Sequence, residues 1–255
     1  MYSNIFDTHA HYDDSRFDED RNALISSLKS KGISHIINCG CDLKSCITTV
    51  SLAESFDFIY AAVGIHAHEA DEATESDLQK IKKLYSNKKV VAVGEIGLDY
   101  HYNFSPRERQ IEIFECQLML SKELDLPVII HDREAHEDTM NLLKKYRPKG
   151  VVHCFSGSAE MAKEIVKLGM YIGIGGAVTF KNAKKPVEVV EYLPVDRLLL
   201  ETDAPYMTPV PFRGQRCDSS YIAYTAEKIA EIKGIDVQEL INICNENAKQ
   251  LFTIK

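Results

Sequence analysis

Eight short apolar runs recur along the chain, and a segment with helical periodicity follows most of them. The runs span residues 4–9, 35–40, 58–64, 90–96, 127–131, 150–155, 170–176 and 197–203. They are continuous rather than alternating, as is typical of strands buried on both faces of a parallel sheet. Neighbouring parallel strands need a crossover connection, which is usually a helix. The pattern therefore predicts an α/β protein built from repeated strand and helix units.

The segments between the runs carry apolar residues at helical spacing. They predict helices over residues 20–31, 43–56, 77–85, 106–124, 137–146, 159–168 and 185–192. In the fourth of these, Ser105 is suited to cap the helix and Glu108 to complete a capping box, with Pro106 at the first helical position. Eight strands alternating with helices are most economically arranged as a (β/α)8 TIM barrel.

No Pro/Gly/Ser-rich linker and no change in composition divides the 255 residues. A chain of this length with 45% apolar residues can bury a large core. We therefore expect residues 1–255 to form one barrel domain, with helices after residue 218 closing its C-terminal end.

Charge and cysteine usage narrow the possible partners and compartment. A net charge of −8 argues against a basic surface that coats nucleic acid, so any such contact must be local or assisted by bound cations. The seven cysteines are an odd number without a CxxC pair, which disfavours a disulfide framework or a zinc finger. No apolar run is long enough to span a bilayer. We expect a soluble, cytoplasmic protein without a membrane partner.

Residues that can bind metal fall at the ends of the apolar runs. In the stretch IFDTHAHYD, His9 and His11 face the same side of a strand, and Asp7 shares that side. In a (β/α)8 barrel the carboxyl ends of the strands form one rim, which carries the catalytic residues. Four imidazoles and two carboxylates fall on this predicted rim, namely His9, His11, Glu95, His131, His153 and Asp203.

Each of these residues alone has a simpler explanation, because a His at a strand end is more often hydrogen bonded or solvated than bound to metal. Six together are harder to explain, since a buried ionisable group is costly unless it is paired or metal-bound. The set exceeds what one tetrahedral ion needs and predicts two divalent cations bridged by Glu95. One ion is assigned to His9, His11, Glu95 and Asp203, and the other to Glu95, His131 and His153.

Two cations roughly 3.5–4 Å apart can activate a shared water and neutralise charge at a phosphoryl or acyl centre, so a hydrolase is predicted. Glu95 and Asp203 are the predicted catalytic residues. Glu95 bridges the ions, and Asp203 binds the activated hydroxide or receives its proton. Histidine ligands suit Zn²⁺ or Mn²⁺ and oxygen ligands suit Mg²⁺, so the choice among these three ions stays open.

Three further residues are predicted to bind substrate. His66 follows the third run on the same rim and is expected to face phosphate, with a solvated loop position as the alternative. Arg133 follows His131 closely and offers a planar guanidinium to a phosphate oxygen. Arg213 lies in a loop bounded by Pro and Gly after the eighth run. Salt bridges at the surface are the alternative for both arginines.

Several other groups near the rim remain open. Glu201 shares a strand face with Asp203 and either orients a ligand or pairs with Arg or Lys. Cys39 and Cys41 are interpreted as packing residues. Five aromatic residues are candidates to stack on unpaired bases, although packing is the commoner role for any one of them: Tyr100, Phe104, Phe155, Tyr206 and Phe212.

Five segments resemble the signature blocks of the TatD family of metal-dependent deoxyribonucleases, within the amidohydrolase-like superfamily. In order along nearly the whole chain they are DTHAH, GEIGLDY, LPVIIHDREAHED, HCFSGS and ETDAPYMTP. The resemblance implies a (β/α)8 barrel of the metal-dependent hydrolase type, divalent-metal dependence and hydrolysis of DNA phosphodiester bonds, often as a 3′–5′ exonuclease. It also implies that the six rim residues are the family's metal ligands.

The sequence thus favours a deoxyribonuclease that acts as a 3′–5′ exonuclease on single-stranded DNA through a hydroxide activated by two metal ions. The alternative is a deacylase or amidase that uses the same cluster. It is less favoured because the fourth run ends without a lysine, which supplies a carbamylated bridge in several amidohydrolases. A barrel that binds metal without catalysis is a third hypothesis, which the complete ligand set disfavours.

Two segments depart from the family pattern. Residues 64–70 read GIHAHEA where GIHPH is usual, and residues 213–220 read RGQRCDSS where an Asn and a Pro are usual. Neither change touches the predicted metal ligands. Both segments follow strands at the predicted catalytic rim, so they bear on substrate binding rather than on metal binding. The preference for DNA or RNA and the oligomeric state stay open, with a monomer expected.

Overall fold

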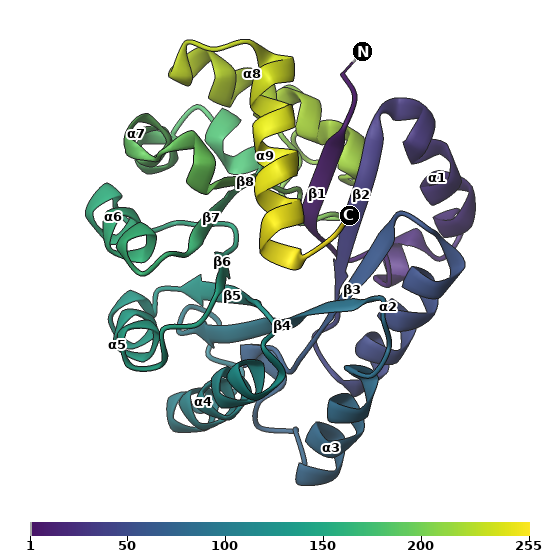
Figure 1. The fold of residues 1–255 in the computed structure, drawn as a ribbon, viewed down its shortest axis with the longest axis vertical. Coiled ribbons are helices and arrows are strands. Elements are labelled where there is room, and N and C mark those ends of the chain that lie inside the picture. Colours follow the sequence, from purple (N-terminus) through teal and green to yellow (C-terminus); the bar gives the residue numbers. More distant parts are fainter. Residues whose placement is uncertain (1) are drawn as a thin grey trace.

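The computed structural model describes residues 2–255 and contains an eight-stranded parallel sheet in which the strands pair in chain order. Helices cover the outside of the sheet (Figure 1). The predicted (β/α)8 TIM barrel is therefore confirmed. The strands are β1 (Ile5–Ala10), β2 (Ile33–Cys39), β3 (Ile59–Val63), β4 (Val90–Asp99), β5 (Val128–Arg133), β6 (Gly150–Val152), β7 (Tyr171–Ile174) and β8 (Leu198–Leu200).

The helices lie close to their predicted positions. They are α1 (Arg21–Leu28), α2 (Leu43–Ser55), α3 (Glu75–Leu84), α4 (Arg107–Leu124), α5 (His136–Tyr146), α6 (Ala159–Lys167), α7 (Lys184–Tyr192), α8 (Ile222–Lys233) and α9 (Val237–Phe252). Helix α3 begins two residues before its predicted start because Thr74 and Asp77 form a capping box there. Within residues 2–255, no helix is both apolar enough and long enough to cross a membrane.

The prediction that Ser105 caps α4 is wrong. The helix begins after Pro106 without a side-chain cap. The Ser105 hydroxyl instead donates to the carbonyl oxygen of His68 at 2.9 Å and accepts from the backbone N–H of Asp71 at 3.0 Å. Ser105 therefore joins the loop between β4 and α4 to the loop that follows β3.

Two layers of buried side chains hold the barrel together. One fills the interior and includes Phe6, Ile129 and Leu199 from three strands and Phe252 from α9. The other lies between the strands and the surrounding helices, with Ile113 and Phe114 of α4 as examples. Each strand faces both layers, which explains why the strands are continuous apolar runs in the sequence.

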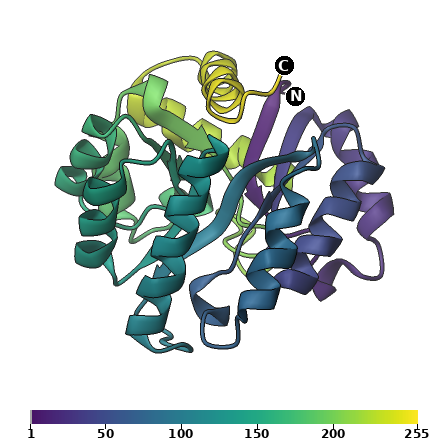
Figure 2. The ribbon, with the colours of Figure 1, turned by 60° about the horizontal axis from the view of Figure 1, so that its bottom comes forward.

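The last helix closes the end of the barrel opposite to the one expected. Asn247 of α9 donates to the carbonyl oxygens of Val195 and Leu198 at the start of β8, at 2.8 and 3.0 Å. Asn245 likewise donates to Asn4, just before β1, at 2.7 Å. Figure 2 shows α9 lying across the end where the chain enters the barrel. The carboxyl ends of the strands, where the predicted site lies, are left uncovered by this helix.

The barrel closes at a seam between β1 and the segment after β8. One isolated bridge pairs Ala10 with Ala204, and the backbone N–H of Asp203 donates to the carbonyl oxygen of His9 at 2.9 Å. Asp7 crosses the same seam, because its carboxylate accepts from the Thr202 hydroxyl and the Ser219 hydroxyl, each at 2.6 Å. Asp7 thus serves the seam rather than the group formed by His9 and His11.

Candidate metal centre

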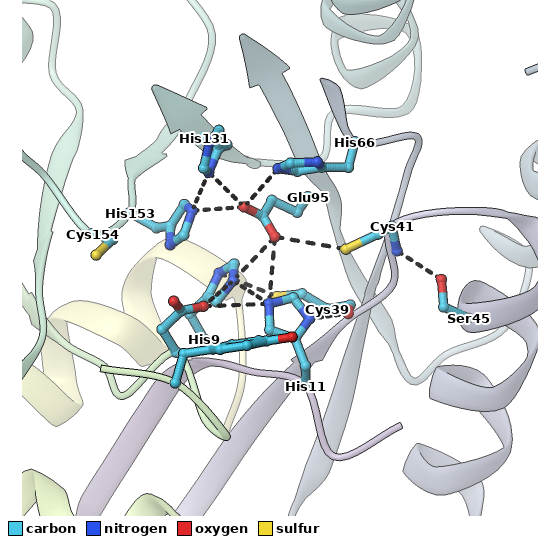
Figure 3. Close-up of polar contacts among 12 residues, drawn as sticks. His9, His11, Cys39, Cys41, Ser45, His66, Glu95, His131, His153 and Cys154 are labelled. Atoms are coloured by element: carbon cyan, nitrogen blue, oxygen red, sulfur yellow. Dashed lines mark hydrogen bonds and ion pairs between the residues drawn. The ribbon is translucent and has the colours of Figure 1, made fainter. Parts of the chain in front are cut away.

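Glu95 occupies the middle of a cluster of histidines at the open end of the barrel (Figure 3). Strand β4 continues to Asp99, three residues beyond the predicted run 90–96, and Glu95 within it is only 3% exposed. Its Oε1 lies 2.7 Å from Nε2 of His153 and 3.1 Å from Nδ1 of His131. His66 approaches the same oxygen at 3.5 Å.

The second oxygen of Glu95 faces the residues of the seam. Its Oε2 lies 3.3 Å from Nε2 of His9 and 3.5 Å from Nε2 of His11. Asp203 Oδ1 is 3.7 and 3.5 Å from the same two nitrogens. Because each oxygen of Glu95 has its own histidine partners, the carboxylate lies between two groups of donor atoms, as the proposed bridge requires.

The donor atoms fit divalent cations. Tetrahedral ligands about 2.0–2.1 Å from an ion lie about 3.3 Å apart, and the contacts of Glu95 and Asp203 with the histidines span 2.7–3.7 Å. Nε2 of His9 and Nε2 of His11 are 3.0 Å apart. Burial and the nearby His153 lower the pKa of His9 to about 4, so this imidazole is neutral at pH 7 and offers a lone pair.

All six predicted ligands come together, and His66 joins them. The four clusters of potential ligand atoms draw on His9, His11, Cys41, His66, Glu95, His131, His153 and Asp203. The structure therefore brings together the six side chains that the rim argument selected, and adds His66 and Cys41 to them. Their roles as ligands remain a proposal.

Asp99 is a residue that the sequence reasoning missed. Its Oδ2 lies 3.1 Å from Nε2 of His131 and 2.9 Å from Nε2 of His68. Burial lowers the pKa of His131, but hydrogen bonds to Asp99 and Glu95 outweigh burial and raise that pKa to about 9. The sequence held one signal, because Asp99 lies four residues after Glu95 and so shares its strand face.

Cys41 is a second residue whose role was missed. Cys39 is fully buried, in agreement with its interpretation as a packing residue. Cys41 instead lines the cavity, and its Sγ lies 3.8 Å from Oε2 of Glu95. It forms a potential ligand group with His11 and Glu95. The CxC spacing at the end of β2 was the available signal.

Glu201 pairs with neither of its predicted partner types in the hydrogen bonds and ion pairs of residues 2–255. Its Oε1 accepts from the backbone N–H of Cys154, and burial raises the pKa of Glu201 to about 8. Its Oε2 and Nδ1 of His153 are buried without a hydrogen-bond partner among the described residues. This carboxyl group therefore lies near the candidate ligand His153, and its ionised form raises the pKa of that imidazole.

A cavity of about 750 Å³ opens over the cluster. Arg133 lines it, and the Arg133 guanidinium lies 4.6 Å from the centre of the Tyr102 ring. Arg213 does not line this cavity. It stacks at 3.7 Å on Phe180, in a separate cavity. Arg216, in the same loop, forms a surface ion pair with Asp20 at 2.6 Å.

A (β/α)8 barrel with histidines and carboxylates converging at the carboxyl ends of its strands defines the class of metal-dependent barrel hydrolases. The sequence matches the family described as TatD related DNase over residues 6–253. The chain belongs to this family and is a metal-dependent hydrolase.

Relatives of known sequence or structure match over nearly the full length. An uncharacterized metal-dependent hydrolase of Bacillus subtilis, YabD, is 48% identical over 98% of this chain and 99% of its own. A protein of a Rahnella species named 3′-5′ ssDNA/RNA exonuclease TatD is 35% identical over 94% of this chain and 95% of its own. The crystal structure of YjjV, a TatD homolog from Escherichia coli, has a TM-score of 0.93 at 34% identity and covers 100% of both chains.

Proposed function

We propose that this enzyme removes nucleotides from the 3′ end of single-stranded DNA by hydrolysing phosphodiester bonds with two divalent metal ions. The observation that carries the proposal is the Glu95 carboxylate, which has one oxygen against each histidine group at the floor of an open cavity. The relative named as a single-strand exonuclease supports the choice of a phosphodiester over an amide.

The proposed ligands divide between the two oxygens of Glu95. His9, His11 and Asp203 would hold one ion with Glu95, and His131 and His153 would hold the other with Glu95. When bound, the two cations lower the pKa of a water and neutralise charge on the phosphate. Mg²⁺, Mn²⁺ and Zn²⁺ are the candidate ions.

The remaining steps fall to side chains in the cavity. Asp203 accepts a proton from the attacking water, whose oxygen bonds to phosphorus as the bond from phosphorus to the 3′ oxygen of the preceding nucleotide breaks. The departing 3′ oxygen takes up a proton from solvent and becomes a hydroxyl group. Arg133 and His66 hold the phosphate oxygens. Arg213, which lies outside the cavity, contacts a more distant part of the strand.

We further propose that residues 1–255 act as one catalytic domain, as a monomer in the cytoplasm. The seven cysteines are all free, which agrees with a reducing compartment.

The test is degradation of oligonucleotides with Mg²⁺, Mn²⁺ or Zn²⁺ added in turn. A single-stranded DNA labelled at its 5′ end should give a ladder of shortening products, whereas a 3′ label should be released at once as a mononucleotide. Single-stranded RNA, duplex DNA and N-acyl amino acids are run beside it. Turnover of N-acyl amino acids without cleavage of any oligonucleotide would replace the nuclease with the deacylase.

A further inference from the structure

Two exposed aromatic rings lie in the loop between β4 and α4, at the mouth of the catalytic cavity. Tyr102 is 49% exposed and lines the cavity, and Phe104 is 67% exposed. Their rings stack in near-parallel fashion, with centroids 5.3 Å apart and planes 14° apart. We call this pair the aromatic platform. Single exposed aromatic residues are common, but a stacked pair beside a reaction centre offers a flat surface for a ligand ring.

The aromatic platform is fixed in place. The Oδ1 atom of Asp99 accepts from the backbone N–H of Tyr102 at 2.9 Å. The His68 ring stands edge-on against both platform rings, at 5.5 Å from Tyr102 and 4.9 Å from Phe104. Ser105, the residue after Phe104, donates a hydrogen bond to the carbonyl oxygen of His68. A surface held by this many contacts loses little freedom when a ligand stacks on it.

The platform and the metal centre share one carboxylate. While Oδ1 of Asp99 holds the loop, its Oδ2 contacts Nε2 of His131 at 3.1 Å, and Nδ1 of His131 contacts Glu95. Arg133 adds positive charge on the same side, over the Tyr102 ring. An aromatic surface, a guanidinium and a cation site in this order match the parts of a nucleotide, namely a base and its phosphate.

We propose that the aromatic platform binds an unpaired nucleobase next to the phosphate that is cleaved. This inference rests on the proposed nuclease function and deepens it. All four bases can stack on aromatic side chains, so the platform accepts any nucleotide sequence. A base within a duplex is already stacked on both faces and paired with its partner base. The platform therefore makes the enzyme prefer single strands.

The binding test uses the metal-loaded enzyme and a single-stranded oligonucleotide with 2-aminopurine at its 3′ end, joined through a non-hydrolysable phosphonate linkage so that no cleavage occurs. Stacking quenches the fluorescence of this base. Phe104→Ala should weaken binding by about 5- to 150-fold, because that is the effect of removing one stacking partner. Phe104→Trp keeps a stacking surface and should bind like the wild type.

Two controls separate stacking from general damage. Tyr192→Ala removes an equally exposed ring, 61% exposed, at the end of α7 and should leave binding unchanged. The second control is an oligonucleotide that lacks the base of its 3′ nucleotide. Its affinity, measured by its competition with the 2-aminopurine strand, should be the same for the wild type and Phe104→Ala. If Phe104→Ala binds the 2-aminopurine strand as tightly as the wild type does, the platform proposal is overturned.

Cleavage assays keep this proposal distinct from the nuclease proposal. If the wild type cleaves oligonucleotides and Phe104→Ala has an unchanged KM on single strands, the platform fails and the nuclease stands. If no oligonucleotide is cleaved with any of the three metals, the nuclease fails. Loss of 2-aminopurine quenching in Phe104→Ala would then still support a nucleobase site.

Discussion

Glu95 is the residue on which both histidine groups converge, so its replacement should affect both at once. Loss of an outer partner of a metal ligand alone costs about 10- to 100-fold in activity, so loss of the shared ligand should cost more than about 100-fold. We expect Glu95→Ala to lower the metal content below one ion per chain and to abolish turnover. Elemental analysis and oligonucleotide cleavage measure the two effects. A variant that keeps two ions and full turnover would refute the bridge.

Asp99 and Glu95 together set the proton affinity of His131. The pKa of His131 is raised to about 9, and a proton on this ring competes with a metal ion. Metal affinity should therefore rise with pH up to about 9. Asp99→Asn removes one of the two hydrogen-bonded charges, so the pKa of His131 should fall and the rise should end at a lower pH. Calorimetric titration of metal between pH 6 and 9.5 tests this, and identical profiles for both proteins would contradict it.

Residues of the candidate site could be predicted from the sequence where a residue that can bind metal ends an apolar run. His9, His131 and Asp203 end such runs, and the sequence alone placed them on one rim. Asp99 could not be assigned in this way, because only the structure places it between the metal centre and the loop that carries Tyr102. The same holds for Cys41, because burial distinguishes it from Cys39 and cannot be read from adjacent residues.

At the scale of single elements, the pairing of β4 with β5 sets the distance between Glu95 and His131. Gly97 pairs with His131 and has φ +144°, and a Cβ atom there would collide with the His131 carbonyl oxygen. We expect Gly97→Ala to push the two strands apart and to weaken metal binding by at least 10-fold, by analogy with loss of a supporting contact.

A matched control isolates the collision from backbone strain. Gly169 also has positive φ, +86°, but its Cβ atom would meet open space. Gly169→Ala should therefore cost about 1 kcal/mol of stability and leave metal binding intact. Metal titration and urea unfolding of both variants distinguish the two effects. Equal metal affinities would show that the strand register tolerates the methyl group.

The seam between β1 and β8 supplies a pH-dependent contribution to stability. Burial raises the pKa of Asp7 to about 6 despite its hydrogen bonds, while the unfolded value is near 3.8. The folded protein thus keeps a proton that the unfolded chain has lost, so the free energy of unfolding should fall as pH rises from 4 to 6. The expected loss is about 3 kcal/mol relative to Asp7→Asn, which does not titrate. Urea unfolding of both proteins at each pH checks the sign.

Element types followed from periodicity, whereas the place of α9 did not. Its amphipathic pattern shows that one face is buried, and Phe252 and Ala248 indeed lie on that face. The pattern does not say which end of the barrel receives the helix. That choice depends on Asn245 and Asn247, whose amides satisfy carbonyl groups at the starts of strands.

At the scale of the whole molecule, metal binding and folding are coupled. The proposed ligands come from strands spread along the chain, so the unfolded chain has no preformed site. A ligand at 100 times its Kd stabilises the folded state by about 2.7 kcal/mol per site. Removal of metal by EDTA should therefore lower the Tm, and added metal should restore it. Glu95→Ala serves as the control, because its Tm should respond to neither treatment.

The seam that joins His9 to Asp203 has a consequence for synthesis of the protein. His9 leaves the ribosome near the beginning of translation, whereas Asp203 follows only after all eight strands. Once Glu95 has been made, a nascent chain carries three of the four ligands proposed for this ion and lacks only Asp203. Truncated products that end before β8 are expected to lack hydrolytic activity, because the set of proposed ligands is completed only after the last strand.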